Sequence, residues 1–490
     1  MAYSDDAFSK KLVENVFPAN WKNPKAGQTY DLLVIGGGPG GMTAATIARE
    51  QQATVALVEK EHMGGECLSY GCIPSKALLR SSRLAADVRN GANFGIEIPN
   101  NWKVDFGAVM QRVHRLQSTL APHDSPEHFK GLGIDLFLGQ ARFLGPNQVE
   151  VGGQTITFKK AIIATGTEPV PLKIPGLTES DYLTNQTIFQ LSTLPKRFGV
   201  IGGGPISCEL AQAFLQFGSE VTLITDSTHL LPRDDLMATE RLKKVFEDEG
   251  MKIFFQSHVE RVEKKGKEKT LYLNQPNQSI TVDEILVAIG RAPAVMGLDL
   301  EKAGISYHTH QGISTNEFLQ TTNPNVYAVG DVTSRYKFTH MSQELASLAV
   351  TNALKGHTKK NSSLNVPWCT FTEPEVAHIG LSEQEAKEKG IATESVIIEL
   401  SNIDRAIVDE ETTGFMKLIV KENSHHIIGA DLMASHAGDM ISELSVAMAS
   451  EQGLLALAQA IHPFPTQAQV VRTAAKTLLQ NREKVEALHV

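Results

Sequence analysis

The feature that most constrains the fold of this chain is one local pattern that occurs twice. Residues 30–35 (YDLLVI) form a short β-branched and leucine-rich run that stops at GGGPGG, after which the composition favours a helix. Residues 196–203 (KRFGVIGG) and the segment SCELAQAFLQFG repeat this order. A further apolar run follows each copy, ATVALVEK and SEVTLIT. The pattern therefore predicts two βαβ units, and with them an α/β chain that carries two dinucleotide-binding folds.

The first glycine cluster has the spacing G-x-G-x-x-G at Gly36, Gly38 and Gly41. Glycines at these positions permit a tight turn, a close approach to a pyrophosphate and tight packing of helix on strand. The phosphates are expected at the N-terminus of the following helix. Glu59 ends the second strand, where a ribose hydroxyl needs an acceptor. This context favours a nucleotide site over a glycine-rich turn without a ligand.

The second cluster carries Gly202, Gly204 and Ser207, and serine is small enough to let the helix pack closely. Its second strand ends at Thr225, which Asp226 follows, and no arginine stands immediately after the strand to meet a 2′-phosphate. The sequence therefore favours NADH over NADPH. Arg233 keeps NADPH open, since a loop could bring its side chain to a phosphate.

The remaining chain predicts a third domain. A helix is expected over residues 104–120, and QVEVGGQTITFKKAIIATG and KTLYLNQPNQSITVDEILVAIG each read as a hairpin that leads into an apolar strand. A strand in NVYAVGD is expected to end at Asp331. From about Pro367, strands alternate with alanine-rich helices, which indicates an α+β domain. A length of 490 residues agrees with about three domains.

Composition excludes several classes of protein. A net charge of −9 opposes nucleic-acid binding, which needs a clustered positive surface. Residues 32–48 form a long uncharged stretch, but glycines and a proline interrupt it, so no membrane span is predicted. Residues 1–29 lack the apolar core of a secretory signal, and the expected location is the cytoplasm.

Two of the four cysteines, Cys67 and Cys72, lie close together in GGECLSYGCIPSK. A helix is expected to begin beside Cys72 and to run through Leu84, so a thiolate there would feel the positive end of the helix dipole. The spacing suits a reversible disulfide. A zinc site would need two further ligands, and Cys208 and Cys369 are far away, so no metal site is predicted. Two unrelated buried thiols are the alternative.

The cysteine segment, the two glycine clusters, IIATG, VAIGR and VYAVGDV together resemble the FAD-dependent pyridine nucleotide-disulfide oxidoreductases. The resemblance runs from about Tyr30 to the C-terminus. It implies two Rossmann-like domains, for FAD and NAD(P), plus a C-terminal α+β dimerisation domain. It divides the chain into an N-terminal extension (1–29), a discontinuous FAD-binding domain (30–178 and 292–362), an NAD(P)-binding domain (179–291) and a dimerisation domain (363–490).

The resemblance also implies roles for individual residues. Cys72 would be the thiol beside the flavin and Cys67 the outer thiol that meets the substrate. Lys76 and Glu209 resemble the ion pair beside the flavin's hydride-accepting nitrogen, and Asp331 would bond the ribityl chain. The further positions that match cofactor-contacting turns are Thr165, Gly166, Gly290, Arg291 and Gly330.

Near the C-terminus the chain departs from the disulfide-reducing members of this family. Alignment of Pro465-Thr466 with the family's Pro-Thr puts Phe464 where those members have a catalytic histidine and Gln469 where they have a glutamate. His462 matches only an outer histidine, so packing or a backbone hydrogen bond is its expected role, and acid/base work the lesser alternative. Splitting a disulfide needs a group that moves protons, which phenylalanine cannot do. Mercuric reductases also have an aromatic residue there.

The sequence thus predicts a homodimeric flavoenzyme that passes electrons from NAD(P)H through FAD to Cys67 and Cys72. It resembles mercuric reductase, and the acceptor would be Hg(II) or another thiol-reactive molecule. The chain ends NREKVEALHV, without the terminal cysteine pair of mercuric reductases. Dihydrolipoamide dehydrogenase is the alternative enzyme, and a slow flavin-binding redox sensor or scaffold is the alternative from another class.

Overall fold

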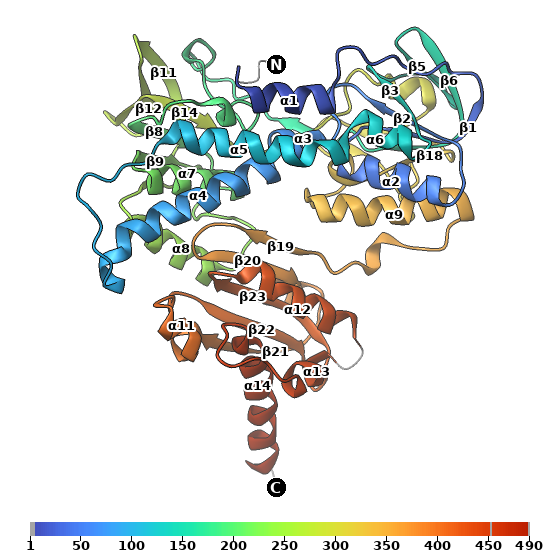
Figure 1. Ribbon diagram of the computed structural model, residues 1–490. Coiled ribbons are helices and arrows are strands. Elements are labelled where there is room, and N and C mark those ends of the chain that lie inside the picture. The colour runs from blue at the N-terminus through green and yellow to red at the C-terminus, as the bar shows by residue number, and fades with distance from the viewer. Residues whose placement is uncertain (1–4, 451–452, 489–490) are drawn as a thin grey trace. The chain divides into compact units, whose positions relative to one another are not determined.

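The computed structural model describes residues 5–450 and 453–488, which fall into two units (Figure 1). The first unit comprises Met1–Lys173, Leu177–Leu194 and Leu286–Leu364. The second comprises Ile174–Gly176, Pro195–Ile285 and Asn365–Val490. Each unit is built around its own sheets.

A seven-stranded sheet forms the centre of the first unit, in the order β3-β2-β1-β6-β5-β4, with β18 also paired to β6. β1 (Thr29–Ile35) pairs in parallel with both β2 (Val55–Glu59) and β6 (Gln154–Ile163), and every residue of β2 is buried, as expected for a strand covered on both faces. The other strands of the unit are β3 (Asp135–Leu138), β4 (Arg142–Gly145), β5 (Gln148–Val151), β7 (Thr167–Pro169), β15 (Arg291–Pro293), β16 (Tyr307–His308), β17 (Gly312–Ile313) and β18 (Val326–Ala328).

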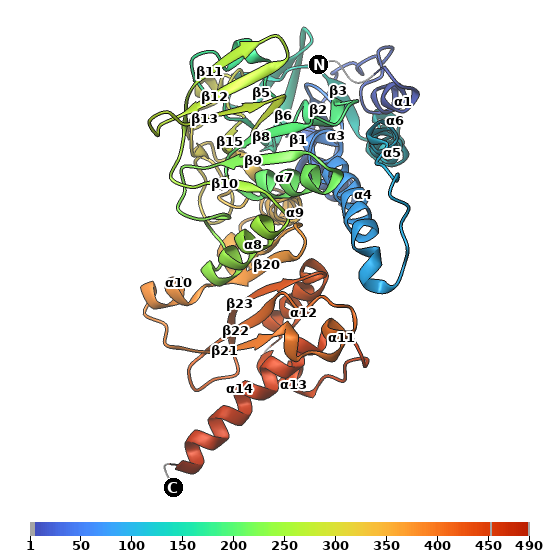
Figure 2. The same cartoon turned by 90° about the vertical axis from the view of Figure 1, so that its left-hand side faces the viewer.

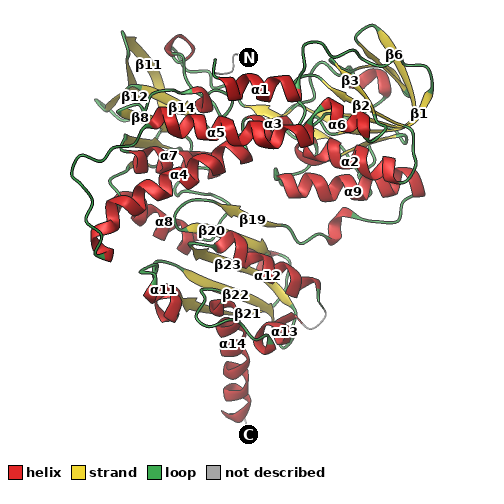
Figure 3. Cartoon of the chain, viewed as in Figure 1, coloured by secondary structure: helices red, strands yellow, loops and turns green. Residues whose placement is uncertain are grey.

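Helices α2 (Pro39–Glu50) and α9 (Thr339–Lys355) lie side by side against this sheet (Figures 1 and 3). The cysteine segment folds into the short helix α3 (Gly65–Ser69) and the long helix α4 (Cys72–Asn90). The other helices of the unit are α1 (Ala7–Val16), α5 (Phe106–Leu120), α6 (Pro126–Gly131) and the 3-10 turns η1 (Gly91–Phe94), η2 (Ala121–Asp124), η3 (Thr178–Ser180), η4 (Ile188–Gln190), η5 (Leu300–Ala303), η6 (Gly330–Val332) and η7 (Asn361–Ser363).

The second unit contains the repeat of the βαβ pattern. β8 (Arg197–Ile201), α7 (Pro205–Phe217) and β9 (Glu220–Ile224) belong to a sheet of order β10-β9-β8-β14. Beside it lies the three-stranded antiparallel sheet β11-β12-β13 (Figure 2). The remaining elements of this part are α8 (Leu236–Asp248), β10 (Lys252–Phe254), β11 (Val259–Lys265), β12 (Glu268–Leu273), β13 (Ser279–Val282) and β14 (Glu284–Val287, which crosses the unit boundary).

The C-terminal part of the second unit is a five-stranded antiparallel sheet of order β19-β20-β23-β22-β21. Helices α12 (Ala437–Ala449) and α14 (Gln469–Leu488) pack their alanine, leucine and valine side chains on it, which closes one apolar core. The elements are β19 (Pro367–Thr370), β20 (Glu375–Gly380), β21 (Thr393–Glu399), β22 (Phe415–Lys421), β23 (Ile427–Ala434), α10 (Glu383–Glu388), α11 (Asp404–Val408), α13 (Gly453–Gln459) and the turn η8 (Leu400–Asn402).

These elements confirm the predicted fold class and both βαβ units. Two local predictions differ from the structure. The strand expected to reach Asp331 ends at Ala328, because Gly330 (φ +71°) turns the chain into η6, which holds Asp331. The helix expected to run through Leu84 continues to Asn90. Over the residues that the structure describes, no helix is long and apolar enough to cross a membrane.

Candidate functional site

The first glycine turn leaves no space for side chains at Gly36 and Gly41. Gly36 has a φ of +112°, and a Cβ there would lie 2.3 Å from the carbonyl oxygen of Ala164. A Cβ on Gly41 would lie 1.8 Å from the carbonyl oxygen of Gly36, so only glycine lets α2 approach the turn this closely. Gly38 caps α2 in extended conformation, and its own Cβ position is open. The helix N-terminus is thus accessible to an anion.

Glu59 lies at the end of β2, beside this turn. It is buried, and its carboxylate accepts hydrogen bonds from the backbone N–H groups of Gly37 (2.5 Å) and Glu61 (2.6 Å). Burial raises the pKa of Glu59, and the two N–H groups partly offset that effect. A carboxylate can accept more than two hydrogen bonds, so a ribose hydroxyl fits the same group.

A polar cluster joins the predicted cofactor turns of the first unit. The guanidinium of Arg291 donates to the Thr167 hydroxyl (2.7 Å) and carbonyl (2.9 Å) and forms an ion pair with Glu66. The Thr167 hydroxyl lies 3.3 Å from the carboxylate of Asp331, whose pKa burial raises. The turn at Gly166 is held by Ala294, which donates its N–H to the Gly166 carbonyl (3.0 Å). Arg291, Asp331 and Gly166 therefore share one region.

The other predicted residues of these turns have local partners. The Thr165 hydroxyl donates to the carbonyl of Ala294 at 2.8 Å. Gly290 (φ +124°) and Gly330 (φ +71°) both adopt backbone conformations that favour glycine. A Cβ on Gly330 would lie 2.7 Å from the Ser342 hydroxyl, so α9 packs directly on this turn.

The two cysteines lie next to each other as free thiols, Cys67 on α3 and Cys72 as the first residue of α4. The pKa of Cys67 is raised, first because its proton is held in a hydrogen bond to the Cys72 sulfur and second by burial. Cys72 is exposed, and its sulfur lies 3.4 Å from the Thr339 hydroxyl. The position at a helix N-terminus favours the anionic form of Cys72. The two sulfurs therefore lie within hydrogen-bond reach of each other, with Cys72 at a helix N-terminus.

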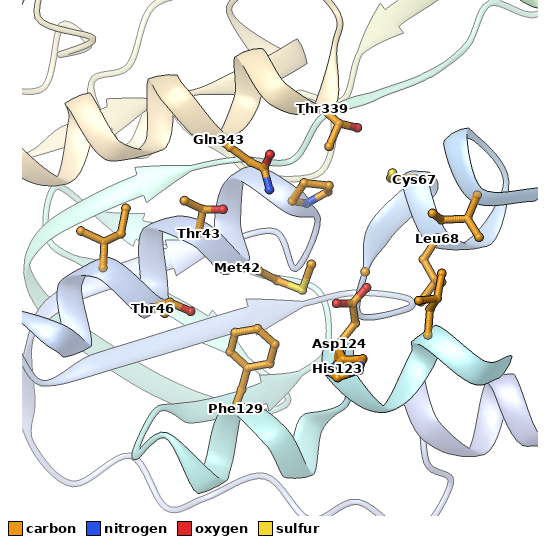
Figure 4. A pocket seen from close by; sticks show the side chains of 15 residues that line it. Met42, Thr43, Thr46, Cys67, Leu68, His123, Asp124, Phe129, Thr339 and Gln343 are labelled. Carbon is orange, nitrogen blue, oxygen red and sulfur yellow. The ribbon is translucent and has the colours of Figure 1, made fainter. Parts of the chain in front are cut away.

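A cavity of about 570 Å³ opens beside Cys67, between α2, α3 and the N-terminus of α9 (Figure 4). Its walls are largely apolar, with Met42, Leu68 and Phe129 among them, and Asp124 contributes a carboxylate. Within the described residues its lining contains no Lys or Arg. The full lining is Pro39, Met42, Thr43, Thr46, Ile47, Gly64, Cys67, Leu68, Ile73, Leu120, His123, Asp124, Phe129, Thr339 and Gln343.

The second glycine turn repeats the first in the other unit. Gly202 has a φ of +127°, and Gly204 caps α7 with an open Cβ position. Ser207 is fully buried on α7, which agrees with close packing at the third motif position. Asp226 is exposed just after β9, and Arg233 is exposed in the loop that follows.

Lys76 and Glu209 lie in different units. Lys76 is on the second turn of α4, half-buried, in the first unit. Glu209 is buried on α7 in the second unit, where its carboxylate accepts the backbone N–H of Phe371 at 3.0 Å.

The C-terminal segment gives His462 a partner that the sequence did not suggest. Its Nε2 lies 2.8 Å from the Glu443 carboxylate on α12, and its Nδ1 lies 3.3 Å from the carbonyl of Ala460. Both ring nitrogens are thus engaged, which favours a structural role. Phe464 is 70% exposed, and Gln469 begins α14.

Sequence reasoning missed Glu66, Asp124, Thr167 and Thr339. Glu66 directly precedes Cys67, so its charged side chain could have been predicted to lie near the cysteine pair. Thr167 directly follows the predicted turn residues Thr165 and Gly166, which was a local signal. Asp124 and Thr339 are joined to the site only by tertiary contacts, and no local pattern marks them.

Two glycine turns at helix N-termini and one pair of adjacent cysteines beside a cavity define a class, the nucleotide-dependent dithiol oxidoreductases. Comparison with known families agrees with this class: the model described as pyridine nucleotide-disulphide oxidoreductase matches residues 30–349, and its dimerisation domain matches residues 366–475. The chain belongs to this family, and it is an FAD-dependent pyridine nucleotide-disulfide oxidoreductase.

Named relatives fall into more than one branch. The chain is 35% identical to a mercuric reductase of Staphylococcus aureus over 93% of its own length and 84% of the relative. It is 32% identical to a dihydrolipoyl dehydrogenase of Mycoplasma pneumoniae over 92% and 98%. Among solved structures, the HOCl-induced flavoprotein disulfide reductase RclA from Escherichia coli has a TM-score of 0.81 at 28% identity, covering 91% of this chain and 99% of that one.

Proposed function

We propose that this enzyme passes electrons from a nicotinamide cofactor through FAD to Cys67 and Cys72, which reduce Hg(II) or another thiol-reactive acceptor. The observation that carries the proposal is the pair of adjacent cysteines, with Cys67 in the lining of a cavity and its pKa raised. Bound FAD would supply the two electrons, taken from the nicotinamide as hydride.

The first unit fits FAD. Gly36, Gly38 and Gly41 would let the pyrophosphate reach the N-terminus of α2, and Glu59 would accept from a ribose hydroxyl. The cluster of Thr165, Gly166, Gly290, Arg291, Gly330 and Asp331 would hold the remainder of the molecule. Lys76 would stabilise negative charge on the bound ring, with Glu209 as its ion-pair partner.

We assign the nicotinamide cofactor to the second turn, at Gly202, Gly204 and Ser207, and favour NADH. The FAD-binding domain is proposed to span residues 30–178 and 292–362, after the extension 1–29, and the NAD(P)-binding domain residues 179–291. The dimerisation domain would span 363–490. We propose a cytoplasmic homodimer, with the match to the dimerisation domain as support for the dimer.

The charge of the cavity lining restricts which electron acceptors would bind there. Since no Lys or Arg lines it within the described chain, a polyanion such as oxidised glutathione gains no charge pairing there. Phe464 and Gln469 remove the histidine and glutamate on which disulfide-reducing members depend. A soft metal ion carried on thiolates needs only sulfur ligands, which Cys67 and Cys72 supply. The mercuric reductase relatives support the same choice.

Dihydrolipoamide dehydrogenase is the second candidate. The apolar walls at Met42, Ile47, Leu68 and Phe129 suit the hydrocarbon ring of a lipoyl group. Against it, splitting the lipoyl disulfide needs proton transfer, and Phe464 stands where related disulfide reductases have the histidine that performs it, so lipoamide turnover would need a proton carrier from another part of the chain.

The test is an anaerobic NADH titration of the FAD-loaded enzyme, followed by steady-state rates with Hg(II), lipoamide, oxidised glutathione and a quinone. At two-electron reduction we expect a thiolate-to-flavin charge-transfer band, and this band should be lost in Cys72→Ser. Cys67→Ser should lower the Hg(II) rate by at least 100-fold.

A matched control is Cys369→Ser, which replaces a cysteine on β19 of the C-terminal sheet, outside both glycine turns, and should keep the band. Lipoamide turnover comparable to the Hg(II) rate would reverse the ranking of the two candidates. Slow reduction without the band would favour the redox-sensor alternative.

A further inference from the structure

We propose that Asp124 accepts the proton of the Cys67 thiol and returns it to the leaving group, the work that the histidine at the position of Phe464 performs in related disulfide reductases. The inference rests on the proposed function, because it concerns the exchange step at Cys67. It gives the chain a proton-transferring side chain, which the C-terminal segment does not supply at Phe464.

Asp124 is the last residue of η2, and its carboxylate lies in the cavity that Cys67 also lines (Figure 4). A Cβ on Gly64 would lie 2.6 Å from the Asp124 Oδ2 atom. The carboxylate therefore sits against the turn that leads into α3, and α3 carries Cys67. The absence of a side chain at Gly64 makes room for this approach.

The Asp124 carboxylate is available for proton transfer. Over the described residues it accepts no hydrogen bond and forms no ion pair, and it is only half-buried, so an acceptor in the cavity can reach it. Burial raises its pKa, and the nearby His123 and His128 partly offset this effect. Its negative charge contributes to the raised pKa of Cys67.

The titratable groups that face Asp124 are few. His123 belongs to the same turn, His128 lies on α6 and Cys67 lies on α3. The cavity walls from α2 and α9 are uncharged, at Pro39, Met42, Thr43, Thr46, Ile47, Thr339 and Gln343. Asp124 is therefore the one carboxylate in the described lining of the cavity.

The step balances without another reactant. As the Cys67 sulfur attacks an acceptor sulfur, the S–H bond breaks and the proton moves to Asp124, while the acceptor's S–S bond breaks and its electron pair stays on the leaving sulfur. Asp124 then returns the proton to that sulfur. The Cys72 thiolate next attacks the Cys67 sulfur, which forms the Cys67–Cys72 disulfide and releases the second half of the acceptor. For a thiolate-bound Hg(II), the Hg–S bond breaks in place of the S–S bond.

Two disulfide probes separate proton transfer from electrostatics. Cleavage of the aromatic disulfide 5,5′-dithiobis(2-nitrobenzoate) releases a stable thiolate that needs no proton. Cleavage of 2-hydroxyethyl disulfide releases a basic thiolate, which has to be protonated as it leaves. In the NADH-reduced holoenzyme, Asp124→Asn should lower kcat with 2-hydroxyethyl disulfide by about 100-fold and change the aromatic probe by less than about threefold. Asp124→Glu should recover most of the loss.

A second readout uses alkylation of Cys67 by iodoacetamide, followed by peptide mass. Because Asn removes a charge that raises the pKa of Cys67, alkylation at neutral pH should be equal or faster in Asp124→Asn, although turnover falls. In the wild type, kcat/KM for 2-hydroxyethyl disulfide should rise with pH through the pKa of Asp124, and this limb should vanish in the variant. Glu127→Gln removes an exposed carboxylate outside the cavity and should leave the rates unchanged.

Three outcomes would overturn the proposal. Asp124→Asn could accelerate both probes, which means a purely electrostatic role, or slow both equally, which means damage to the cavity. Thirdly, Asp124→Asn could leave kcat unchanged while His462→Ala lowers it. If the charge-transfer band forms normally in each variant, electron transfer to the cysteine pair is intact. Such a result would contradict the role of Asp124 and leave the proposed redox function standing.

Discussion

The carboxylate of Asp226 is exposed where we propose that the 2′ position of a bound nicotinamide cofactor would lie. Asp226 follows β9 directly, and NADPH would bring a 2′-phosphate to the end of that strand. Like charges at such a site cost about 1–2 kcal/mol, or roughly tenfold in affinity. Arg233, in the loop that follows β9, is the cation that would offset this repulsion by pairing with the 2′-phosphate.

We therefore expect kcat/KM for NADH to exceed that for NADPH by about tenfold, and Asp226→Ser to narrow the ratio to about twofold. The measurement is the initial rate of each reduced nicotinamide under one set of conditions. Asp248→Asn, which removes an exposed acid at the end of α8, should leave the ratio unchanged. A wild-type preference for NADPH that Arg233→Ala abolishes would show that Arg233 reads the phosphate.

Residues whose chemistry is local were predictable from the sequence. The glycine turns and Cys67–Cys72 are short segments whose spacing alone defines a local geometry, and the structure has Gly36 and Gly202 at positive φ and the two cysteine sulfurs in contact. Asp124 and Glu443 were not predictable, because each gains its role from a partner brought near by folding. Nothing in the segment APHD indicates that its carboxylate will reach the turn at Gly64.

At the scale of elements, the close packing of α2 on the first glycine turn depends on the absence of a side chain at Gly41. We expect Gly41→Ala to destabilise the fold by about 3 kcal/mol and to reduce FAD content, since its Cβ would overlap the Gly36 carbonyl. Thermal unfolding and the flavin-to-protein absorbance ratio measure both effects. Gly131→Ala, where a Cβ meets nothing within 4 Å, should change stability by about 1 kcal/mol at most. Equal effects of the two substitutions would contradict this account.

Other elements show the limit of local patterns. Residues 1–29 gave no sign of a fold, yet α1 forms, with its N-cap Asp6 bound to the Nδ1 atom of His114 on α5 at 2.8 Å. Leu12 and Val16 bury their side chains in the first unit. The helix is stabilised by this tertiary packing, which a short isolated segment cannot supply. The sequence of residues 1–29 alone therefore does not predict α1, because the contact with α5 is distant along the chain.

At the scale of the whole molecule, the second unit exposes apolar side chains that a monomer does not need. Val446 on α12 is 73% exposed, and Ile461 and Phe464 in the segment after α13 are 90% and 70% exposed. The hydrogen bond between Glu443 and His462 ties that segment to α12, one turn from Val446, so these side chains belong to one surface. Such a surface is typical of an interface.

We expect the 53.4 kDa chain to run as a dimer in size-exclusion chromatography with light scattering. Val446→Glu with Phe464→Glu should shift it toward monomer, because each carboxylate would be desolvated at the interface. Leu84→Glu with Phe94→Glu, which alters exposed apolar residues of the first unit, is the matched control and should stay dimeric. If the dimer survives the first pair and dissociates with the second, the interface lies on the first unit. We propose that Phe464 stands at the position of the family's catalytic histidine, so loss of the dimer should also alter acceptor turnover without loss of the charge-transfer band.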